Sequence, residues 1–107
     1  MTSPITLLFS EEMTEAVLAG RKVLTSRRTC KGAPGDTFEV RGSQYRLVDV
    51  FRCELRNVRD TLFRLEGCDS PEQFEQVWRD LHGGEFQETD RLFVHAFAKV
   101  ACCGCGE

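Results

Sequence analysis

The most informative segment of the sequence is Gly20-Arg21-Lys22-Val23-Leu24-Thr25-Ser26-Arg27. Its glycine can adopt the left-handed conformation in which many helices end. The residues that follow it, 23–28, are β-permissive, so the octapeptide predicts the point at which a helix ends and a strand begins. Lys22 is then expected in the connection, close to the negative end of the helix, with regular strand geometry beginning after it.

A short helix is predicted upstream of this octapeptide, at residues 11–19. Ser10 is a good N-cap, and Glu11 and Glu12 suit the positive end of the helix dipole. The apolar side chains of the segment fall on one helical stripe, which comprises Met13, Val17 and Leu18. We therefore expect the helix to bury one face and to end before Gly20.

Two strands and a hairpin are predicted downstream. Residues 30–36 contain the loop signal Lys-Gly-Ala-Pro-Gly-Asp, and residues 37–41 alternate like a strand. Gly42-Ser43 then predicts a two-residue turn into a long strand at residues 44–55. The apolar phase changes along this strand, which predicts bulges of the kind that let a strand wrap around a small barrel.

The C-terminal half predicts more helix and one central strand. Ser70-Pro71-Glu72-Gln73 supplies an N-cap, a proline at the first helical position and a capping-box glutamine, so a helix is expected at residues 71–82. Residues 58–65 predict one or two helical turns, and residues 92–100 are apolar on both faces, as in a central strand. With a first strand at residues 5–9, too few helices connect the strands for a doubly wound sheet. We therefore expect an α+β fold, a small mixed β-barrel with about three short helices packed on it.

Length and composition predict a single domain. The chain has 107 residues, of which 41% are apolar and 29% are charged, and we assign residues 1–100 to the domain and residues 101–107 to a cysteine-rich tail. No apolar run approaches the roughly 18 to 20 residues that cross a bilayer. The N-terminus lacks a basic leader, so the cytoplasm is the expected compartment and reduced thiols are expected for the six cysteines.

The tail sequence Cys102-Cys103-Gly104-Cys105 raises the question of a metal site. Three adjacent thiolates could bind a thiophilic metal, but alone they do not complete a tetrahedral shell. We predict no metal site and no cofactor, and the simpler expectation for the tail is a flexible, oxidation-prone segment. The sequence leaves both possibilities for the tail open.

Charge is distributed unevenly along the chain. The net charge is −3, yet residues 16–35 contain five basic residues and no acidic one, so the remainder carries −8. The basic residues are Arg21, Lys22, Arg27, Arg28 and Lys31. This window is either an edge strand protected by cations or a site for an anion or a nucleotide. The acidic remainder argues against strong nonspecific binding to DNA.

Several segments together carry a resemblance to a known family. The octapeptide at residues 20–27 matches the pattern Gly-x-Lys-x-x-Thr-x-Arg, the opening signature of the ASCH domain family, whose relatives are the PUA-like RNA-binding barrels. Pro34-Gly35-Asp36 resembles the turn before the next strand of the family, and Leu65-Glu66-Gly67-Cys68 resembles its Glu-Gly segment. Residues 70–74 and 93–100 resemble its capped helix and closing strand. The resemblance covers about residues 9–100 in the family's order.

Within that family the chain is most similar to small bacterial amidohydrolases that remove the acyl group from N4-acetylcytidine. The catalytic lysine, threonine and glutamate of those enzymes fall on Lys22, Thr25 and Glu66. The resemblance therefore implies an amidohydrolase acting on N4-acetylcytidine or a related N4-acylated nucleoside. Thr25 would be the nucleophile, Lys22 its base, and Glu66 a donor to the base ring and the leaving amine.

The chemistry places two demands on these residues. The hydroxyl of Thr25 needs a base within hydrogen-bond reach, so Lys22 must be at least partly neutral. Burial and neighbouring cations favour the neutral amine, whereas a carboxylate pointing at Lys22 favours the ammonium. The conflict eases if Glu66 is protonated or points away from Lys22. Residues three apart in a regular strand also face opposite sides, so the long side chain of Lys22 would have to curl toward Thr25.

Each of these residues also has a plain interpretation. Lys22 can be an exposed cation, Thr25 a β-favouring strand residue, and Glu66 a solvated residue after a helical turn. Further substrate or RNA contacts are predicted for Arg21, Arg27, Arg28, Lys31 and Tyr45, although core packing is the more common role for a tyrosine in such a strand. His95 is predicted to be buried and hydrogen-bonded.

A second function is an RNA-binding or RNA-cleaving PUA-like module that uses the basic window at residues 21–31. The predicted partner is thus a small nucleoside substrate or RNA, and no membrane. The acyl group, the choice between free nucleoside and RNA, and the oligomeric state are not determined by the sequence.

Overall fold

A computed structural model of the chain describes residues 3–100. The predicted cysteine-rich tail lies outside the described residues. Within residues 3–100 there are three helices and four strands, in the order α1 (Glu11–Leu18), β1 (Leu24–Arg27), β2 (Thr37–Val40), β3 (Ser43–Glu54), α2 (Leu55–Thr61), α3 (Pro71–Leu81) and β4 (Arg91–Lys99). The three helices and the small sheet confirm the predicted α+β class.

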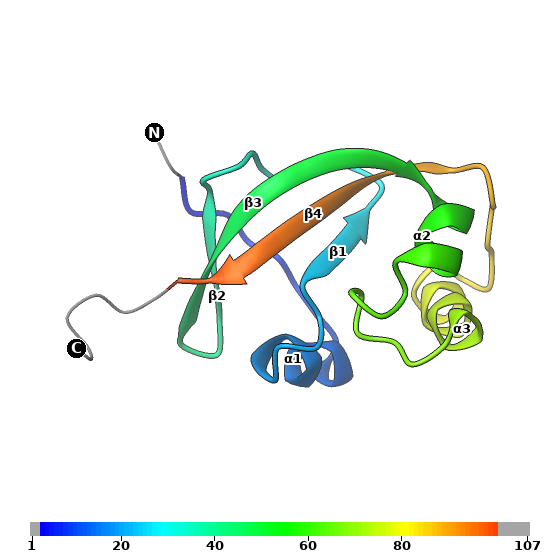
Figure 1. Cartoon of the computed structure of the whole chain (residues 1–107), viewed down its shortest axis with the longest axis horizontal. Helices are drawn as coiled ribbons and strands as arrows, with labels where there is room; N and C mark the ends of the chain where they lie inside the picture. Colours follow the sequence, from blue (N-terminus) through cyan, green and yellow to red (C-terminus); the bar gives the residue numbers. More distant parts are fainter. Residues whose placement is uncertain (1–2, 101–107) are drawn as a thin grey trace.

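The strands form one antiparallel sheet in the order β1-β4-β3-β2. β3 and β4 arch together over the molecule, so the sheet curls into a half-barrel rather than closing (Figure 1). Two isolated bridges extend it, a parallel one between Pro4 and Thr37 and an antiparallel one between Lys22 and Glu66. The strand predicted at residues 5–9 does not form. The amide of Ile5 donates to the carbonyl of Thr37 at 2.8 Å, and the segment then leaves the sheet.

The phase change predicted in the long strand is a bulge in β3. Its pairing with β4 shifts register between Leu47 and Asp49, which leaves Val48 as the extra residue. Tyr45 and Leu47 before the bulge are buried, whereas the side chain of Val48 is 57% exposed. The predicted bulge is therefore confirmed, and it lets β3 contribute to two parts of the core.

The turns and caps follow the sequence with small shifts. The hydroxyl oxygens of Ser10 and Ser70 accept hydrogen bonds from the first turns of α1 and α3, as predicted for N-caps. Gly20 follows α1 with a φ of 81°, the left-handed conformation expected of it. The β2–β3 turn consists of Arg41 and Gly42, one residue earlier than predicted. Both of its residues have positive φ, as the twist of a two-residue hairpin turn favours.

α2 begins at Leu55, earlier than the helical turns predicted at residues 58–65. Leu55 and Val58 are both fully buried, and a helix starting at Leu55 brings both onto the face that packs against α3 and the sheet. Tertiary packing therefore set this boundary. No helix of the described residues is long and apolar enough to cross a membrane.

Two apolar clusters hold the fold together. The first fills the space between α2, α3 and the sheet and includes Leu55, Val58, Phe74, Trp78, Leu92 and Val94. The second lies between α1, β2 and the sheet and includes Val17, Phe38, Tyr45, Leu47 and Phe97. α1 and the α2–α3 pair cover the inside of the curled sheet at its two ends, and β1 runs between them (Figure 1). The candidate site lies along β1.

Candidate functional site

A cavity of about 380 Å³ opens between the segment before α1, strand β1 and helix α3. One wall is apolar and comes from α3, which contributes Phe74, Val77, Trp78 and Leu81. The facing wall is polar and comes from β1 and its flanks, together with Glu66. All three residues to which the resemblance assigns catalysis, Lys22, Thr25 and Glu66, line this cavity.

Lys22 and Glu66 form a buried ion pair at the start of β1. The Lys22 Nζ lies 2.9 Å from Glu66 Oε1 and also donates to the Glu66 carbonyl oxygen at 3.0 Å, and each side chain is only 5% exposed. Lys22 precedes β1, as predicted for a residue in the connection. The carboxylate of Glu66 turns toward Lys22, so of the two arrangements that ease the conflict between their roles, the one in which Glu66 points away from the lysine is not the one present. Neither residue is the exposed surface charge of the plain interpretation.

Backbone geometry brings this pair together. The amides of Val23 and Leu24 donate to the carbonyl of Leu65 at 2.8 and 3.0 Å, which ties the Glu-Gly segment to the start of β1. Gly67 has a φ of 92°, and a Cβ at this position would lie 3.1 Å from the Cβ of Lys22. A glycine after Glu66 therefore allows the turn to approach Lys22 closely.

Ser26 completes the hydrogen bonding of the carboxylate. Its Oγ donates to Glu66 Oε2 at 2.5 Å, so each oxygen of Glu66 accepts from a different side chain. Ser26 was not among the predicted site residues. Strand alternation could have found it, because positions 22, 24 and 26 share one face of an extended segment. Leu24 on that face belongs to the apolar cluster beside α3.

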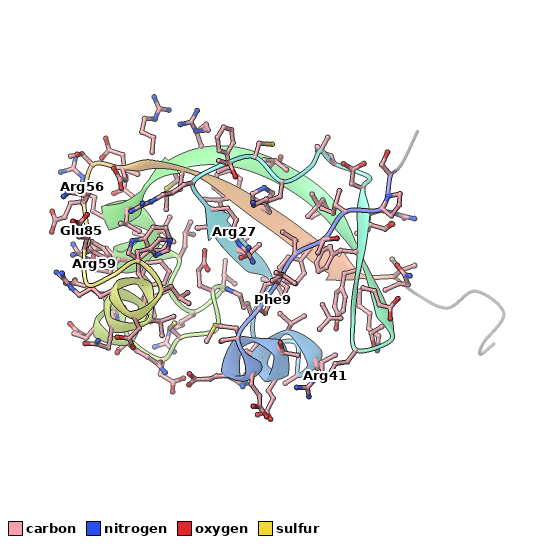
Figure 2. All side chains as sticks on the ribbon, turned by 180° about the vertical axis from the view of Figure 1, so that it is seen from behind. Phe9, Arg27, Arg41, Arg56, Arg59 and Glu85 are labelled. Carbon is pink, nitrogen blue, oxygen red and sulfur yellow. The ribbon has the colours of Figure 1, made fainter. Side chains whose placement is uncertain are left out.

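Thr25 and Arg27 are joined on the other face of β1. The Nε of Arg27 donates to Thr25 Oγ1 at 3.0 Å, and its Nη2 donates to the carbonyl of Leu8 at 2.9 Å. The guanidinium also lies 5.3 Å from the centroid of the Phe9 ring, and Figure 2 shows Arg27 and Phe9 close together beside β1. Burial lowers the pKa of Arg27, while the charge of Glu66 opposes that change. The hydrogen bonds of the Lys22 ammonium go to Glu66, so the predicted bond from Lys22 to Thr25 is not among the bonds of the described residues.

The other predicted binding residues separate into two groups. Arg28 and Lys31 line the cavity and are exposed, and Arg28 forms a long ion pair of 3.6 Å with Asp90. Arg21 is exposed but does not line the cavity, and its amide caps α1 by donating to the carbonyl of Ala16. The predicted substrate or RNA contact of Tyr45 is wrong, because its ring is buried against Phe38 and Phe97 in the second apolar cluster. It cannot offer this cavity a stacking surface.

His95 fixes the loop that carries Lys31. The ring is fully buried in β4, and its Nδ1 lies 3.1 Å from the carbonyl oxygen of Thr25, while Nε2 is 3.0 Å from the amide nitrogen of Lys31. This arrangement suits a neutral ring in which Nδ1–H donates and Nε2 accepts. Burial lowers the pKa of His95, which is consistent with that form. The prediction of a buried, hydrogen-bonded histidine is confirmed.

No described group of three histidine, cysteine, aspartate or glutamate side chains is arranged to hold a metal ion. The three cysteines among residues 3–100, Cys30, Cys53 and Cys68, are free thiols. Cys68 lines the cavity, and burial raises the pKa of its thiol. The site is therefore built from a lysine, a carboxylate, two hydroxyls and further cations.

Comparison with known proteins supports the fold. No protein-family model and no curated protein matches the sequence. Among solved structures, the chain is similar to an ASCH domain from Lactobacillus crispatus JV V101, with a TM-score of 0.72 and 17% identity over 92% of this chain and 79% of that one. It is also similar to the hypothetical protein PH0355, with a TM-score of 0.64 and 20% identity over 94% of this chain and all of the other. A third similar structure is protein EF3133 from Enterococcus faecalis V583, with a TM-score of 0.60 and 16% identity over 94% of this chain and 76% of that one. The chain therefore has the fold of an ASCH domain.

Proposed function

We propose that this protein is a small amidohydrolase that removes the acyl group from N4-acetylcytidine or a related N4-acylated nucleoside. The observation that carries the proposal is the buried Lys22–Glu66 pair on the wall of a cavity that Thr25 also lines. The cavity volume of about 380 Å³ lies within the range of about 300 to 1,000 Å³ that is usual for small-molecule sites. Its apolar wall on α3 suits the face of a pyrimidine ring.

The ion pair offers a source of both the base and the acid that amide hydrolysis needs. Transfer of one proton along the 2.9 Å hydrogen bond converts the ammonium and carboxylate into an amine and a carboxylic acid. Burial disfavours the charged forms, and a substrate that displaces water from the cavity disfavours them further. In the proposed reaction Lys22 then acts as a base and Glu66 as a donor.

The first half of the reaction forms an acyl-enzyme. The oxygen of Thr25 attacks the acyl carbon while its proton passes to the amine of Lys22, which must swing from Glu66 toward Thr25. The bond between the acyl carbon and N4 then breaks, and the acid of Glu66 protonates the leaving amine. The hydrogen bond that Arg27 donates to Thr25 Oγ1 stabilises negative charge developing on that oxygen.

The second half restores the protein. After Lys22 returns its proton to Glu66, a water molecule attacks the acyl ester and gives a proton to the amine of Lys22. The ester bond to Thr25 breaks, and the threonine oxygen takes its proton from Glu66. The carboxylic acid product leaves, and Lys22 and Glu66 are again an ammonium and a carboxylate.

The test is a chromatographic assay of cytidine release from N4-acetylcytidine by the purified protein. We expect turnover by the wild type, and loss of at least about 100-fold in kcat for Lys22→Ala and Thr25→Ala, in line with removal of a general base or a nucleophile. Arg46→Ala, which removes an exposed cation of β3 that does not line the cavity, is the matched control and should keep full activity. Absence of turnover by the wild type, or full turnover by Thr25→Ala, contradicts the proposal.

A second candidate function is an RNA-binding PUA-like module. The observation that favours it is the exposure of Arg28 and Lys31 at the cavity, within the basic window at residues 21–31. Binding of this kind falls steeply as salt concentration rises, because cations that neutralise phosphates release counterions. A titration of single-stranded RNA at two salt concentrations tests it, and tight salt-sensitive binding without hydrolysis of N4-acetylcytidine favours this function.

A further inference from the structure

We infer that the cavity takes a phosphorylated ligand, an N4-acylated cytidine nucleotide carrying a single phosphate, in preference to the free nucleoside. The inference rests on the proposed function for the identity of the base and acyl group. The anion site itself is argued from the charges of the cavity wall.

The cavity wall has a strong excess of positive charge. Among the described residues, four basic side chains line it, those of Lys22, Arg27, Arg28 and Lys31, against one carboxylate, that of Glu66. Glu66 is already paired with Lys22, so the remaining three cations give the wall a charge of +3 in a protein whose net charge is −3. An uncharged nucleoside gives these cations nothing to neutralise.

Two of the three cations have no acidic partner among residues 3–100. Arg27 donates only to neutral oxygens, those of Thr25 and Leu8, and Lys31 forms no ion pair. The ion pair of Arg28 with Asp90 is long, at 3.6 Å, and both side chains are more than a third exposed, so it competes weakly with a bound anion. Arginine and lysine together are the usual ligands of phosphate oxygens in proteins.

The Lys22–Glu66 pair and the cations Arg28 and Lys31 lie at opposite ends of β1. Lys22 precedes the strand, whereas Arg28 and Lys31 follow it, and the strand itself spans about 10 Å at roughly 3.3 Å per residue. An acylated base bound near Lys22 and Glu66 would therefore direct its sugar phosphate toward the other end of β1. The hydrogen bond from the amide of Lys31 to His95 holds the cation-bearing loop at that end.

The charge outside the cavity favours a mononucleotide over a polymer. The protein has a net charge of −3 and the cavity wall carries +3, so the remaining residues carry −6, and this excess of negative charge repels the many phosphates of an RNA strand. A single phosphate inside the cavity is attracted by the local excess of cations. It lies away from most of the acidic residues, so they repel it little.

The test compares ligands that differ only by the phosphate. Binding of cytidine and of cytidine 5′-monophosphate is measured by titration calorimetry, and kcat/KM is measured for N4-acetylcytidine and its 5′-monophosphate. We expect the phosphate to improve both quantities by about tenfold or more, as one or two charge-assisted hydrogen bonds would. The double variant Arg28→Ala/Lys31→Ala should lose this advantage, while Arg46→Ala should keep it.

The outcomes separate the inference from the proposed function. Selective binding of the monophosphate without any hydrolysis supports the anion site and contradicts the amidohydrolase. Equal binding of the two ligands, or a phosphate advantage that survives in the double variant, overturns the inference. Tighter binding of a cytidine-containing oligonucleotide than of the monophosphate overturns it in favour of RNA.

Discussion

The ammonium of Lys22 lies 2.9 Å from the carboxylate of Glu66, 44 residues later in the chain, and the two side chains are buried together on the wall of a cavity. A buried pair of this kind is expensive to break, because removing one partner leaves an uncompensated charge in a low-dielectric site. It is also chemically useful, since a single proton transfer makes both members neutral.

Replacing one partner of this pair should be more damaging than replacing both. We expect Glu66→Leu to lower the free energy of unfolding by about 3 to 5 kcal/mol, because it leaves Lys22 buried and unpaired. The double variant Lys22→Met/Glu66→Leu removes both charges and should recover much of that loss. Denaturant unfolding of the wild type, both single variants and the double variant measures the coupling, and additive losses would contradict the prediction.

Ser26→Ala should destabilise the protein through Glu66. The hydroxyl of Ser26 donates to a buried carboxylate oxygen, and a hydrogen bond to a charged group contributes about 1.5 to 3 kcal/mol. We expect a loss of that size in chemical denaturation. Ser43→Ala, in the β2–β3 hairpin, is the control and should cost less than about 0.5 kcal/mol, as for surface substitutions. Equal losses in the free energy of unfolding for Ser26→Ala and Ser43→Ala would contradict a stabilising role for the hydrogen bond from Ser26 to Glu66.

The stability of the protein should depend on pH through His95. Burial holds the folded-state pKa of His95 below its ordinary value of 6.5, so at pH values below about 6.5 the unfolded chain binds a proton that the folded chain resists. The unfolded state then holds more protons, and the free energy of unfolding falls as pH falls.

The variant His95→Gln isolates this contribution. We expect the stability difference between the wild type and His95→Gln to be largest above pH 7 and to shrink as the pH falls below about 6.5, as the contribution of neutral His95 is lost. The measurement is thermal or urea unfolding of both proteins across this range. A difference that is constant with pH would show that His95 titrates alike in the folded and unfolded states.

Gly67→Ala should disturb the approach of the Glu-Gly turn to Lys22. The substitution places a Cβ 3.1 Å from the Cβ of Lys22 and 3.2 Å from that of Ala16, at a φ of 92°. Gly42→Ala is a matched control, because its φ is 85° and a Cβ there would meet nothing within 4 Å. Both variants place a side chain on a left-handed backbone, which destabilises the folded state by about 1 to 2 kcal/mol. Only Gly67→Ala adds a steric clash and should therefore be the less stable of the two. Equal melting temperatures of the two variants would contradict this prediction.

The local signals of the sequence were sufficient for most of the elements. Serine caps, a glycine after a helix and alternating apolar residues act over a few positions, so they predicted α1, α3, β2 and the bulge in β3. The start of α2 and the turn at Arg41 and Gly42 shifted, because burial of Leu55 and the twist of the hairpin outweighed local pattern. Residues 5–9 had a strand-like composition, but the pairing stops at the bridge of the preceding residue, Pro4, and one further hydrogen bond from Ile5.

Local sequence was enough to predict which residue types form the site and which junction carries them, because a helix end followed by a short strand brings Lys22, Thr25, Ser26 and Arg27 into one segment. The hydrogen-bond partners of these residues depend on long-range contacts. The antiparallel bridge between Lys22 and Glu66 joins residues 44 positions apart. The carboxylate of Glu66 accepts hydrogen bonds from Lys22 and Ser26, whereas the hydroxyl of Thr25 accepts one from Arg27. Tyr45 was likewise assigned to the core by the packing of Phe38 and Phe97. Such choices depend on long-range backbone pairing and on which groups lose their water together, and neither is encoded in local periodicity.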